Sequence, residues 1–418
     1  MFSELTFLAT CDLVGLVRGR AIPGSLKEGT SVGWVPADLA ITSFGGIWDE
    51  NPFGSQGDLR LIPVPGASFS LPAIGDGLPW TINLAKQSNI DGTPWQNDPR
   101  EFAERALARL KSEFNIDLIA SFEHEFLLRG DGVSGSPFGL DAARAVEPFG
   151  SALVETLAAN QMEPENWLPE YGSGQFEITL APCDALIAAD RAIALREIAR
   201  DLARRNNLRA TFVPLPHPDS VGNGVHVHLS LWRDGEPLTY DVSKPGNLSS
   251  VASKAFNGIL NHAAAILAWT APSAISFLRL TPHRWSAGGA FIAVQDREAL
   301  LRIAPITSSD PAKAASMFNV EFRAADATAN PWLVIGVLAH ALVEGLRADK
   351  EISAIGVQDK ALPASLEEAI AGLKADVIAS EWFPKELQEV HLGIRETEAK
   401  ILRDLNDAER CERYTNVY

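Results

Sequence analysis

The chain has 418 residues, of which 46% are hydrophobic and 21% charged, and it carries a net charge of −17. This length is enough for a large core, which we expect to be divided between one small and one large domain. The acidic balance argues against DNA or RNA as a partner, because nucleic-acid phosphates are bound by clustered Lys and Arg. It leaves room for a nucleoside triphosphate, which metal ions can accompany into an acidic site.

We find no apolar stretch of the roughly 18 to 20 residues that are needed to cross a bilayer. The most apolar stretch, residues 332–343, contains His340 and is expected to be a core helix. The N-terminal segment lacks the basic region of a signal peptide. Cys11, Cys183 and Cys411 are odd in number and without metal-binding spacing, which favours reduced thiols. We therefore expect a cytoplasmic protein with no membrane partner.

Residues 1–97 are rich in Gly and Pro and contain short runs of β-forming residues, such as residues 14–20 and 59–64, between turn sequences. This pattern predicts a small, mostly β domain. Residues 43–57 are expected to form a long loop. Loops of that length in compact domains are often functional.

Residues 98–418 are expected to form a larger domain of helices and strands. Asp98 and Pro99 are suited to the N-cap and first position of a helix that runs to about Phe114, and a strand is expected at residues 116–128. Further helices are predicted near residues 141–160, 184–206, 250–269, 331–349, 364–378 and 384–407. Further strands are predicted near residues 175–180, 208–213, 224–232, 291–295 and 318–323.

Glu123 and Glu125 lie two residues apart in the first of these strands. Residues at this spacing point to the same face of a strand, here from an otherwise apolar run. Two like charges on one buried face are costly unless a cation lies between them. The alternative is that one of the two is a solvated residue on an exposed face.

Two further segments carry candidate ligands. Glu170 and Glu177 flank a Gly-rich turn that would let the backbone approach a ligand closely, although a plain loop between two elements has the same pattern. His226 and His228 share one face of a predicted strand. Such a pair is typical of metal ligands, and packed neutral core histidines are the alternative.

Glu321 and Arg323 form another pair on one strand face. Together the motifs supply five glutamates and at least one histidine, a set that suits Mg²⁺ or Mn²⁺ rather than structural zinc. Hard cations beside arginines favour a phosphoryl substrate, since both neutralise phosphate charge. The arginines in apolar or Gly-rich surroundings are Arg279, Arg297, Arg302 and Arg323. Neither a P-loop nor a Rossmann glycine motif is present.

The order of these motifs resembles the glutamine synthetase superfamily. The similarity runs through Glu-x-Glu, two glutamates around Gly-Gln, Gly-x-His-x-His-x-Ser, Arg-Leu-x-Pro, Arg-x-x-x-x-Arg and Glu-x-Arg, and it covers nearly the whole chain. Each motif alone is weak, whereas six in this order are specific. The resemblance implies an α+β fold. It has a small β-grasp domain at residues 1–97 and, at residues 98–418, a catalytic domain with a curved antiparallel sheet flanked by helices.

The resemblance also implies a role for each motif residue. The ligands implied for the metal nearest the acid substrate are Glu125, Glu170 and Glu177. Those implied for the metal that accompanies the ATP phosphates are Glu123, His226 and Glu321. The implied catalytic arginines are Arg297, Arg302 and Arg323, with His228, Ser230 and Arg302 near the nucleotide. The implied substrate contacts are Arg279, Gly222 and Trp285.

The reaction implied by the resemblance is the ATP-dependent joining of the γ-carboxylate of glutamate to an amine through γ-glutamyl phosphate. Two or three Mg²⁺ or Mn²⁺ ions would assist at each site, and ATP would be a co-substrate. Members of this family form rings, so the resemblance implies a homo-oligomer, with a dodecamer of two hexameric rings as the expected form.

The sequence departs from the family where ammonium is bound. Residues 42–46 read Thr-Ser-Phe-Gly-Gly, without the Asp of the family's segment, although Asp49 or Glu50 in the same loop could replace it. Trp285 stands where the family's flap carries a Glu. Trp285 beside Trp48 would suit an alkyl or aromatic amine better than a polyamine, which calls for several acids.

Two other positions differ from the family's pattern. Val221 replaces an Asn in the glutamate-binding loop, and Leu215 replaces a Lys. Retained metal ligands with an altered amine site favour an organic amine over ammonia. The alternatives are an ordinary glutamine synthetase, a non-catalytic binding or structural relative, and a metal hydrolase using His226 and His228.

Overall fold

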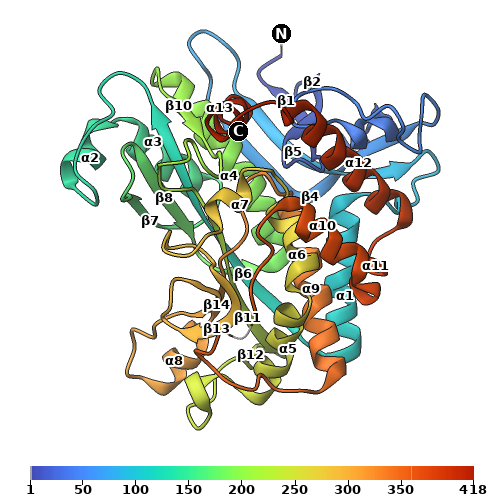
Figure 1. Cartoon of the computed structure of the whole chain (residues 1–418). Helices are drawn as coiled ribbons and strands as arrows, with labels where there is room; N and C mark the ends of the chain where they lie inside the picture. The colour runs from blue at the N-terminus through green and yellow to red at the C-terminus, as the bar shows by residue number, and fades with distance from the viewer. Residues whose placement is uncertain (1, 359) are drawn as a thin grey trace.

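The computed structural model describes residues 2–358 and 360–418. The first β-sheet lies near both chain ends in Figure 1 and has the strand order β2-β1-β5-β4-β3. Its strands are β1 (Leu5–Cys11), β2 (Val17–Pro23), β3 (Val32–Trp34), β4 (Leu59–Leu71) and β5 (Trp80–Asn89). β1 and β5 are parallel and the other neighbours antiparallel. The predicted small β domain is confirmed.

The second sheet has ten strands, with the main order β13-β14-β15-β11-β6-β8-β7. Its strands are β6 (Asp117–Arg129), β7 (Pro164–Pro169), β8 (Gln175–Leu180), β9 (Cys183–Asp184), β10 (Arg209–Thr211), β11 (Val225–Arg233), β12 (Glu236–Pro237), β13 (Gly289–Val294), β14 (Ala299–Ile303) and β15 (Val320–Phe322). β6 is central and pairs with β8, β9, β10 and β11. All pairings are antiparallel except β13 with β14, so the sheet is mixed at one edge.

Helices cover this sheet and fill the space between the two sheets (Figure 1). The longer helices are α1 (Pro99–Phe114), α3 (Phe149–Ala159), α4 (Ala185–Arg205), α5 (Ser250–Asn261), α9 (Pro331–Ala348), α10 (Leu366–Ala375), α12 (Lys385–Leu402) and α13 (Asp407–Thr415). The shorter ones are η1 (Pro36–Ala40), α2 (Leu140–Ala145), η2 (Pro245–Asn247), α6 (Ala263–Thr270), α7 (Ser276–Arg279), α8 (Pro311–Met317) and α11 (Val377–Ser380). Asp98 caps α1 by accepting from the Glu101 N–H, as predicted.

Three predicted helices are each broken in two, and a fourth ends early. The helix expected at residues 141–160 is split into α2 and α3 near Pro148, whose ring nitrogen has no N–H to continue the ladder. That at residues 250–269 divides at His262, and that at residues 364–378 divides at Asp376, which caps α11. That at residues 384–407 ends at Leu402, before Asn406 caps α13.

α9 is long and apolar enough to cross a membrane by length and composition, contrary to our expectation that no stretch reaches that length. Of this 18-residue helix, 78% is buried inside the protein. α9 packs against α1, α4 and α5, and Asn330 caps its first turn. α9 is therefore a core helix, as the His340-containing segment predicted.

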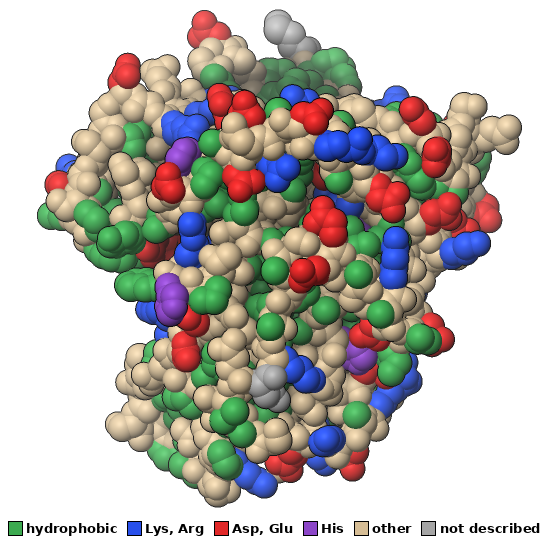
Figure 2. Space-filling view, viewed as in Figure 1, with side chains coloured by type: hydrophobic (Ala, Val, Ile, Leu, Met, Phe, Trp, Pro, Cys, Tyr) green, Lys and Arg blue, Asp and Glu red, His purple; other side chains and the backbone are tan. Residues whose placement is uncertain are grey.

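On the face drawn in Figure 2, Lys and Arg side chains are scattered among Asp and Glu and gather into no broad basic patch. The acidic net charge of the chain is thus not offset on this face by a concentrated positive surface.

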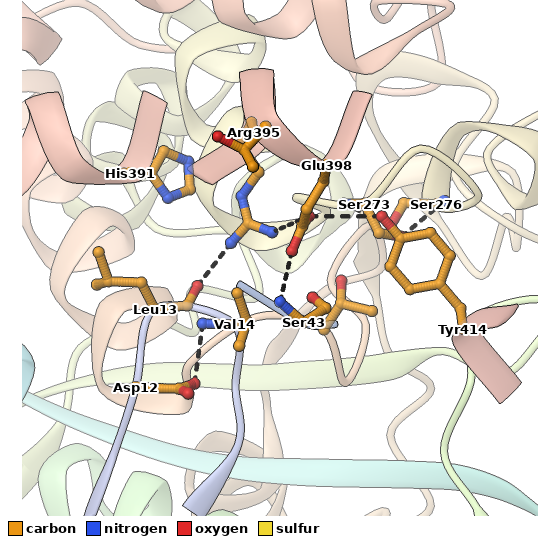
Figure 3. A network of polar contacts seen from close by, with 12 residues as sticks. Asp12, Leu13, Val14, Ser43, Ser273, Ser276, His391, Arg395, Glu398 and Tyr414 are labelled. Atoms are coloured by element: carbon orange, nitrogen blue, oxygen red, sulfur yellow. Dashed lines mark hydrogen bonds and ion pairs between the residues drawn. The ribbon is translucent and has the colours of Figure 1, made fainter. Parts of the chain in front are cut away.

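A buried ion pair joins the C-terminal helices to the first sheet (Figure 3). The side chains of Arg395 and Glu398 are 0% and 2% exposed, and Arg395 Nη1 lies 3.0 Å from Glu398 Oε2. Arg395 Nη2 donates to the Leu13 carbonyl at 2.7 Å, and the Ser43 N–H donates to Glu398 Oε1 at 2.7 Å. α12 thereby fixes both the turn after β1 and the start of the long loop at residues 43–57.

We predict that Glu398→Gln lowers the free energy of unfolding by about 3 to 5 kcal/mol, because it leaves the Arg395 charge buried without its partner. Urea unfolding followed by circular dichroism measures this loss. The matched control is Glu396→Gln on the same helix, since Glu396 is 61% exposed and lies 3.8 Å from Lys374. The control should change stability by less than about 0.5 kcal/mol, and equal effects of the two substitutions would contradict the prediction.

Candidate active site

The strand register brings the predicted carboxylates and imidazoles together on the second sheet. On β6, Glu123 lies opposite His226 of β11, and Glu125 lies opposite Glu177 of β8. On the next strand pair, His228 of β11 lies opposite Glu321 of β15. Strand alternation puts these side chains on one face, so the sequence prediction that each pair shares a face is confirmed.

Between Glu123 and Glu125, His124 points to the opposite face, where it is buried beside Phe122 and Phe212. Burial lowers the pKa of its imidazole to about 3, and neither ring nitrogen has a partner within the described residues. His124 is therefore a neutral core residue. Strand alternation places both glutamates on the other face of β6, away from these apolar surroundings, which would disfavour their charge.

Glu123 is the centre of two groups of ligand-type atoms. In the first, with Glu125 and His226, all three side chains lie within 4.8 Å of one another, and His226 Nδ1 is 2.7 Å from Glu123 Oε1. In the second, the partners are His228 and Glu321, with His228 Nε2 3.5 Å from Glu123 Oε2. His226 Nδ1 is also 3.4 Å from Glu321 Oε1, so the groups are contiguous.

His228 lies within reach of Glu123 and Glu321, two of the ligands implied for the metal that accompanies the ATP phosphates. Its implied place near the nucleotide stays a prediction. Its Nδ1 is 2.9 Å from Asn319 Oδ1, a partner that the sequence did not point to. The signal for His228 was present, because it shares a strand face with His226.

The charges of this cluster are strongly coupled. Burial would raise the pKa of Glu123, but His226 and His228 hold it well below its ordinary value. For His228 burial acts in the lowering direction and is outweighed by Glu123 and Glu321, which raise the pKa to about 9. A cation is therefore electrostatically favoured between these carboxylates.

Glu170 and Glu177 lie beside the two groups without belonging to either. Burial and the neighbouring carboxylates Glu123, Glu125 and Glu170 raise the pKa of Glu177 to about 10. Burial, together with Glu125, also raises the pKa of Glu170. A carboxyl group that keeps its proton because other carboxylates lie nearby can bind a divalent cation in place of that proton.

The donor set fits hard divalent cations. Carboxylate oxygens dominate, imidazole is the minority ligand, and no thiol is part of either group within the described residues. This composition matches Mg²⁺ or Mn²⁺ rather than structural zinc. The Gly224 N–H donates to Glu125 Oε2 at 2.7 Å and leaves the other oxygen of that carboxylate free to ligate.

Arginines close one side of the cluster. Arg302 Nη1 lies 2.7 Å from Glu321 Oε2, and Arg323 Nη1 bonds the other oxygen of Glu321. Arg323 Nε also donates to the carbonyl of Arg297, whose own side chain is exposed. Each guanidinium keeps further N–H groups, in a geometry suited to phosphate or carboxylate.

Arg279 is buried beneath the loop that carries Gly222 and Gly224. It donates to the carbonyls of Ala324 and Ala325, and its Nε has no partner within the described residues. A Cβ on Gly222 would lie 2.5 Å from Arg279 Cγ. Glycine is therefore required for this close approach.

Ser230 is buried two residues beyond His228 on β11, and its hydroxyl accepts from the Trp232 indole N–H at 2.9 Å. This bond leaves the Ser230 O–H as a remaining donor. Leu215, where the family carries a Lys, is fully buried with Val213 and Ile275 in a small apolar cluster. Leu215 therefore contributes to packing rather than to charge.

The rim of the cluster is aromatic. Trp285 is 65% exposed, and its ring centroid lies 6.4 Å from that of Tyr171. Its carbonyl accepts from Arg323 Nη2 at 3.0 Å. The expected pairing of Trp285 with Trp48 is wrong within one chain, because Trp48 packs against Gly393 of α12, which has no side chain to exclude the ring.

The loop at residues 42–46 is anchored to α12, where the Ser43 N–H donates to Glu398 Oε1. Phe44 lies beneath the Arg413 guanidinium, with 4.8 Å between the Arg413 Cζ atom and the ring centroid. Asp49 and Glu50, the candidate replacements for the family's Asp, are exposed further along the loop. Neither belongs to either ligand group.

Comparison with known proteins agrees with this architecture. The family model of the glutamine synthetase N-terminal domain matches residues 2–95, and that of the glutamine synthetase catalytic domain matches residues 96–414. The gamma-glutamylpolyamine synthetase GlnA3 of Streptomyces coelicolor is 31% identical, over 96% of this chain and 90% of its own length. The glutamine synthetase of Thermus thermophilus is 29% identical, over 98% of this chain and 95% of its own.

A solved structure described as a novel glutamine synthase homolog superposes with a TM-score of 0.94 at 38% identity, covering 100% of this chain and 99% of that one. The two family models together span nearly the whole chain. The glutamates, histidines and arginines of the cluster are the residues of the motifs by which the sequence resembles this family. The chain is therefore a member of the glutamine synthetase family, whose members are ATP-dependent ligases.

Proposed function

We propose that this ligase joins the γ-carboxylate of glutamate to an organic amine, with an alkyl or aromatic amine preferred over ammonia. The observation that carries the proposal is Trp285, an exposed ring beside Tyr171 whose backbone carbonyl accepts from Arg323, at the position where the family's flap has a Glu. An ammonium site needs anionic or π-rich walls, and here the family's carboxylates are missing, whereas a ring adds apolar contact for an alkyl or aryl amine.

The relatives support the reaction class and leave two competing amines. GlnA3 of Streptomyces coelicolor is named for polyamines, and the Thermus thermophilus relative is named as a glutamine synthetase. An ordinary glutamine synthetase is the second candidate. It is favoured by the exposed Asp49 and Glu50 in the loop at residues 43–57, either of which could replace the family's Asp. A non-catalytic role is disfavoured, because a structural protein has no need of a buried carboxylate cluster.

The proposed metal ligands are Glu123, Glu125, Glu170, Glu177, His226 and Glu321, and we add His228 from its position beside Glu123. Mg²⁺ or Mn²⁺, when bound, would neutralise charge on the transferring phosphoryl group. The carboxylates hold the ions, and Glu321 also orients Arg302 and Arg323 through its two oxygens.

The chemistry requires two successive displacements. The glutamate γ-carboxylate attacks the terminal phosphorus of ATP, and ADP leaves. The neutral amine then attacks the acyl carbon, and phosphate leaves. Arg297, Arg302 and Arg323 are proposed to stabilise the phosphoryl charge, and Arg279 with Gly222 to bind substrate carboxylate, in the manner of preorganised donors. His228, Ser230 and Arg302 are proposed to face the nucleotide.

We further propose a cytoplasmic homo-oligomer, with a double hexameric ring as the expected form and domains at residues 1–97 and 98–418. Light scattering measures the mass directly. We propose that the loop at residues 43–57 lies at a subunit contact, because its Asp49 and Glu50 are exposed and belong to neither ligand group of their own chain.

Phosphate release from ATP and Mg²⁺ with glutamate tests the proposal across ammonium, methylamine, ethylamine, ethanolamine, putrescine, isopropylamine and aniline. We expect kcat/KM for one alkyl or aryl amine to exceed that for ammonium by at least about 100-fold, because ammonium has no apolar group to bury against the ring and the family's flap carboxylate is absent. Release with ammonium alone would establish the ordinary glutamine synthetase. Fastest release with putrescine would favour the polyamine class.

Trp285→Glu should shift the amine preference of the enzyme from the organic amine toward ammonium. The substitution restores a carboxylate that attracts ammonium and removes the ring, so we expect kcat/KM to fall about 10-fold for the organic amine and to rise about 10-fold for ammonium. Trp285→Phe is the control and should keep the wild-type order. If both variants lose all amines equally, Trp285 has a structural role and the proposal loses its main support.

Glu177→Gln should abolish metal-dependent stabilisation. Burial and the surrounding carboxylates raise the pKa of Glu177 to about 10, so the metal-free chain holds a proton there at neutral pH and glutamine mimics that state. We expect the metal-free melting temperature to change by less than about 3 °C, while the rise on adding Mn²⁺ or Mg²⁺ is lost.

The control for this experiment is Glu155→Gln, an exposed position on α3 that should keep the full metal-dependent rise. A saturating metal stabilises a folded protein by mass action, so the wild-type rise reports the affinity. An unchanged rise in Glu177→Gln would remove Glu177 from the ligand set.

A further inference from the structure

Three loops meet around the aromatic rim. They are residues 170–174, which follow β7, residues 217–222, and residues 281–288, which precede β13. Gly172 lies against Val221, where a Cβ would come within 2.5 Å of the Val221 side chain. Arg284 donates to the carbonyls of Pro218 at 2.7 Å and Ser220 at 3.2 Å. These contacts fix the three loops relative to one another.

Tyr171 lies on the first of these loops and is 60% exposed, beside the 65% exposed ring of Trp285. The centroid distance of 6.4 Å and interplanar angle of 36° leave the two rings tilted rather than stacked. Two large neighbouring aromatic rings that remain in water are uncommon on a surface without a binding role. Their faces carry the negative part of the ring quadrupole.

The backbone ties both rings to the carboxylate cluster. The Tyr171 N–H donates to Glu170 Oε2 at 3.0 Å, and the Trp285 carbonyl accepts from Arg323, which bonds Glu321. Trp285 also has φ of 54°, a left-handed conformation that is unusual for a bulky residue. The backbones of Tyr171 and Trp285 are thus both anchored to residues of the site, and strain of this kind gathers at functional sites.

We propose that Tyr171 determines amine specificity, its ring and that of Trp285 forming an aromatic clamp for the apolar part of the incoming amine. The inference rests on the proposed function and extends it to the substrate class. The amine carries an alkyl or aryl group directly next to its nitrogen, so that the group contacts the rings while the nitrogen faces the cluster. The clamp favours such an amine over ammonium by the apolar contact of its alkyl or aryl group with the two rings, which ammonium cannot make.

Steady-state kinetics of Tyr171→Ala and Tyr171→Phe test the clamp, with the best organic amine and with ammonium. We expect Tyr171→Ala to raise KM for the organic amine about 10-fold, while kcat, KM for glutamate and ATP, and the ammonium rate stay within about two-fold. Tyr171→Phe should retain the wild-type KM, because it keeps the ring and loses only the hydroxyl.

Phe2→Ala is the matched control, since Phe2 is an equally exposed ring (64%) ahead of β1, and it should change no kinetic parameter. The melting temperature of each variant is measured first. If Tyr171→Ala is unstable, it is replaced by Tyr171→Leu, which keeps apolar bulk. For Tyr171→Leu we expect KM for the organic amine to rise at least about three-fold. An unchanged amine KM in Tyr171→Ala, or an equal loss for glutamate and ATP, overturns the inference.

Different kinetic results would overturn the proposed function and the aromatic clamp. Wild-type turnover with ammonium and with no organic amine overturns the proposed function. Wild-type turnover with an organic amine that is unaffected by Tyr171→Ala overturns the clamp alone and leaves the ligase proposal in place.

Discussion

The structure depends on the repulsion between glutamates on neighbouring strands of one sheet. β6 carries Glu123 and Glu125 on one face, and its neighbours add Glu177 on one side and His226 on the other. Such a face cannot remain charged and buried by itself. Histidines, arginines, retained protons and the proposed cations are the means of balancing it, and the long central strand and the helices behind it hold these side chains in place.

Much of the site could be predicted because strand periodicity is a strict constraint. The spacing of two residues in Glu123–Glu125, His226–His228 and Glu321–Arg323 fixes which side chains share a face whatever the exact strand ends. The pairing between strands could not be derived from periodicity, because register depends on contacts distant in sequence. That pairing decides that His228 faces Glu123 and Glu321.

The fold was predicted least well where helices end. α2 and α3 are separate because a proline lies between them, and α12 and α13 because Asn406 caps a new helix. β14 was missed because its apolar run has no alternation and follows a turn directly. Tyr171 was missed because a single aromatic residue in a Gly-rich turn is unremarkable until Trp285, far away in sequence, is seen beside it.

The flap at residues 281–288 is fastened through main-chain atoms rather than through the side chain at its tip. Arg284 bonds the carbonyls of residues 218 and 220, the carbonyl of Trp285 receives Arg323, and Ser286 bonds the carbonyl of Arg279. None of these bonds uses the indole ring. The path of the flap is therefore nearly independent of which residue occupies position 285. Descendants of such a scaffold can acquire new substrates by single substitutions without rebuilding the phosphoryl-transfer machinery beneath, which is one physical route to evolutionary diversification on a conserved core.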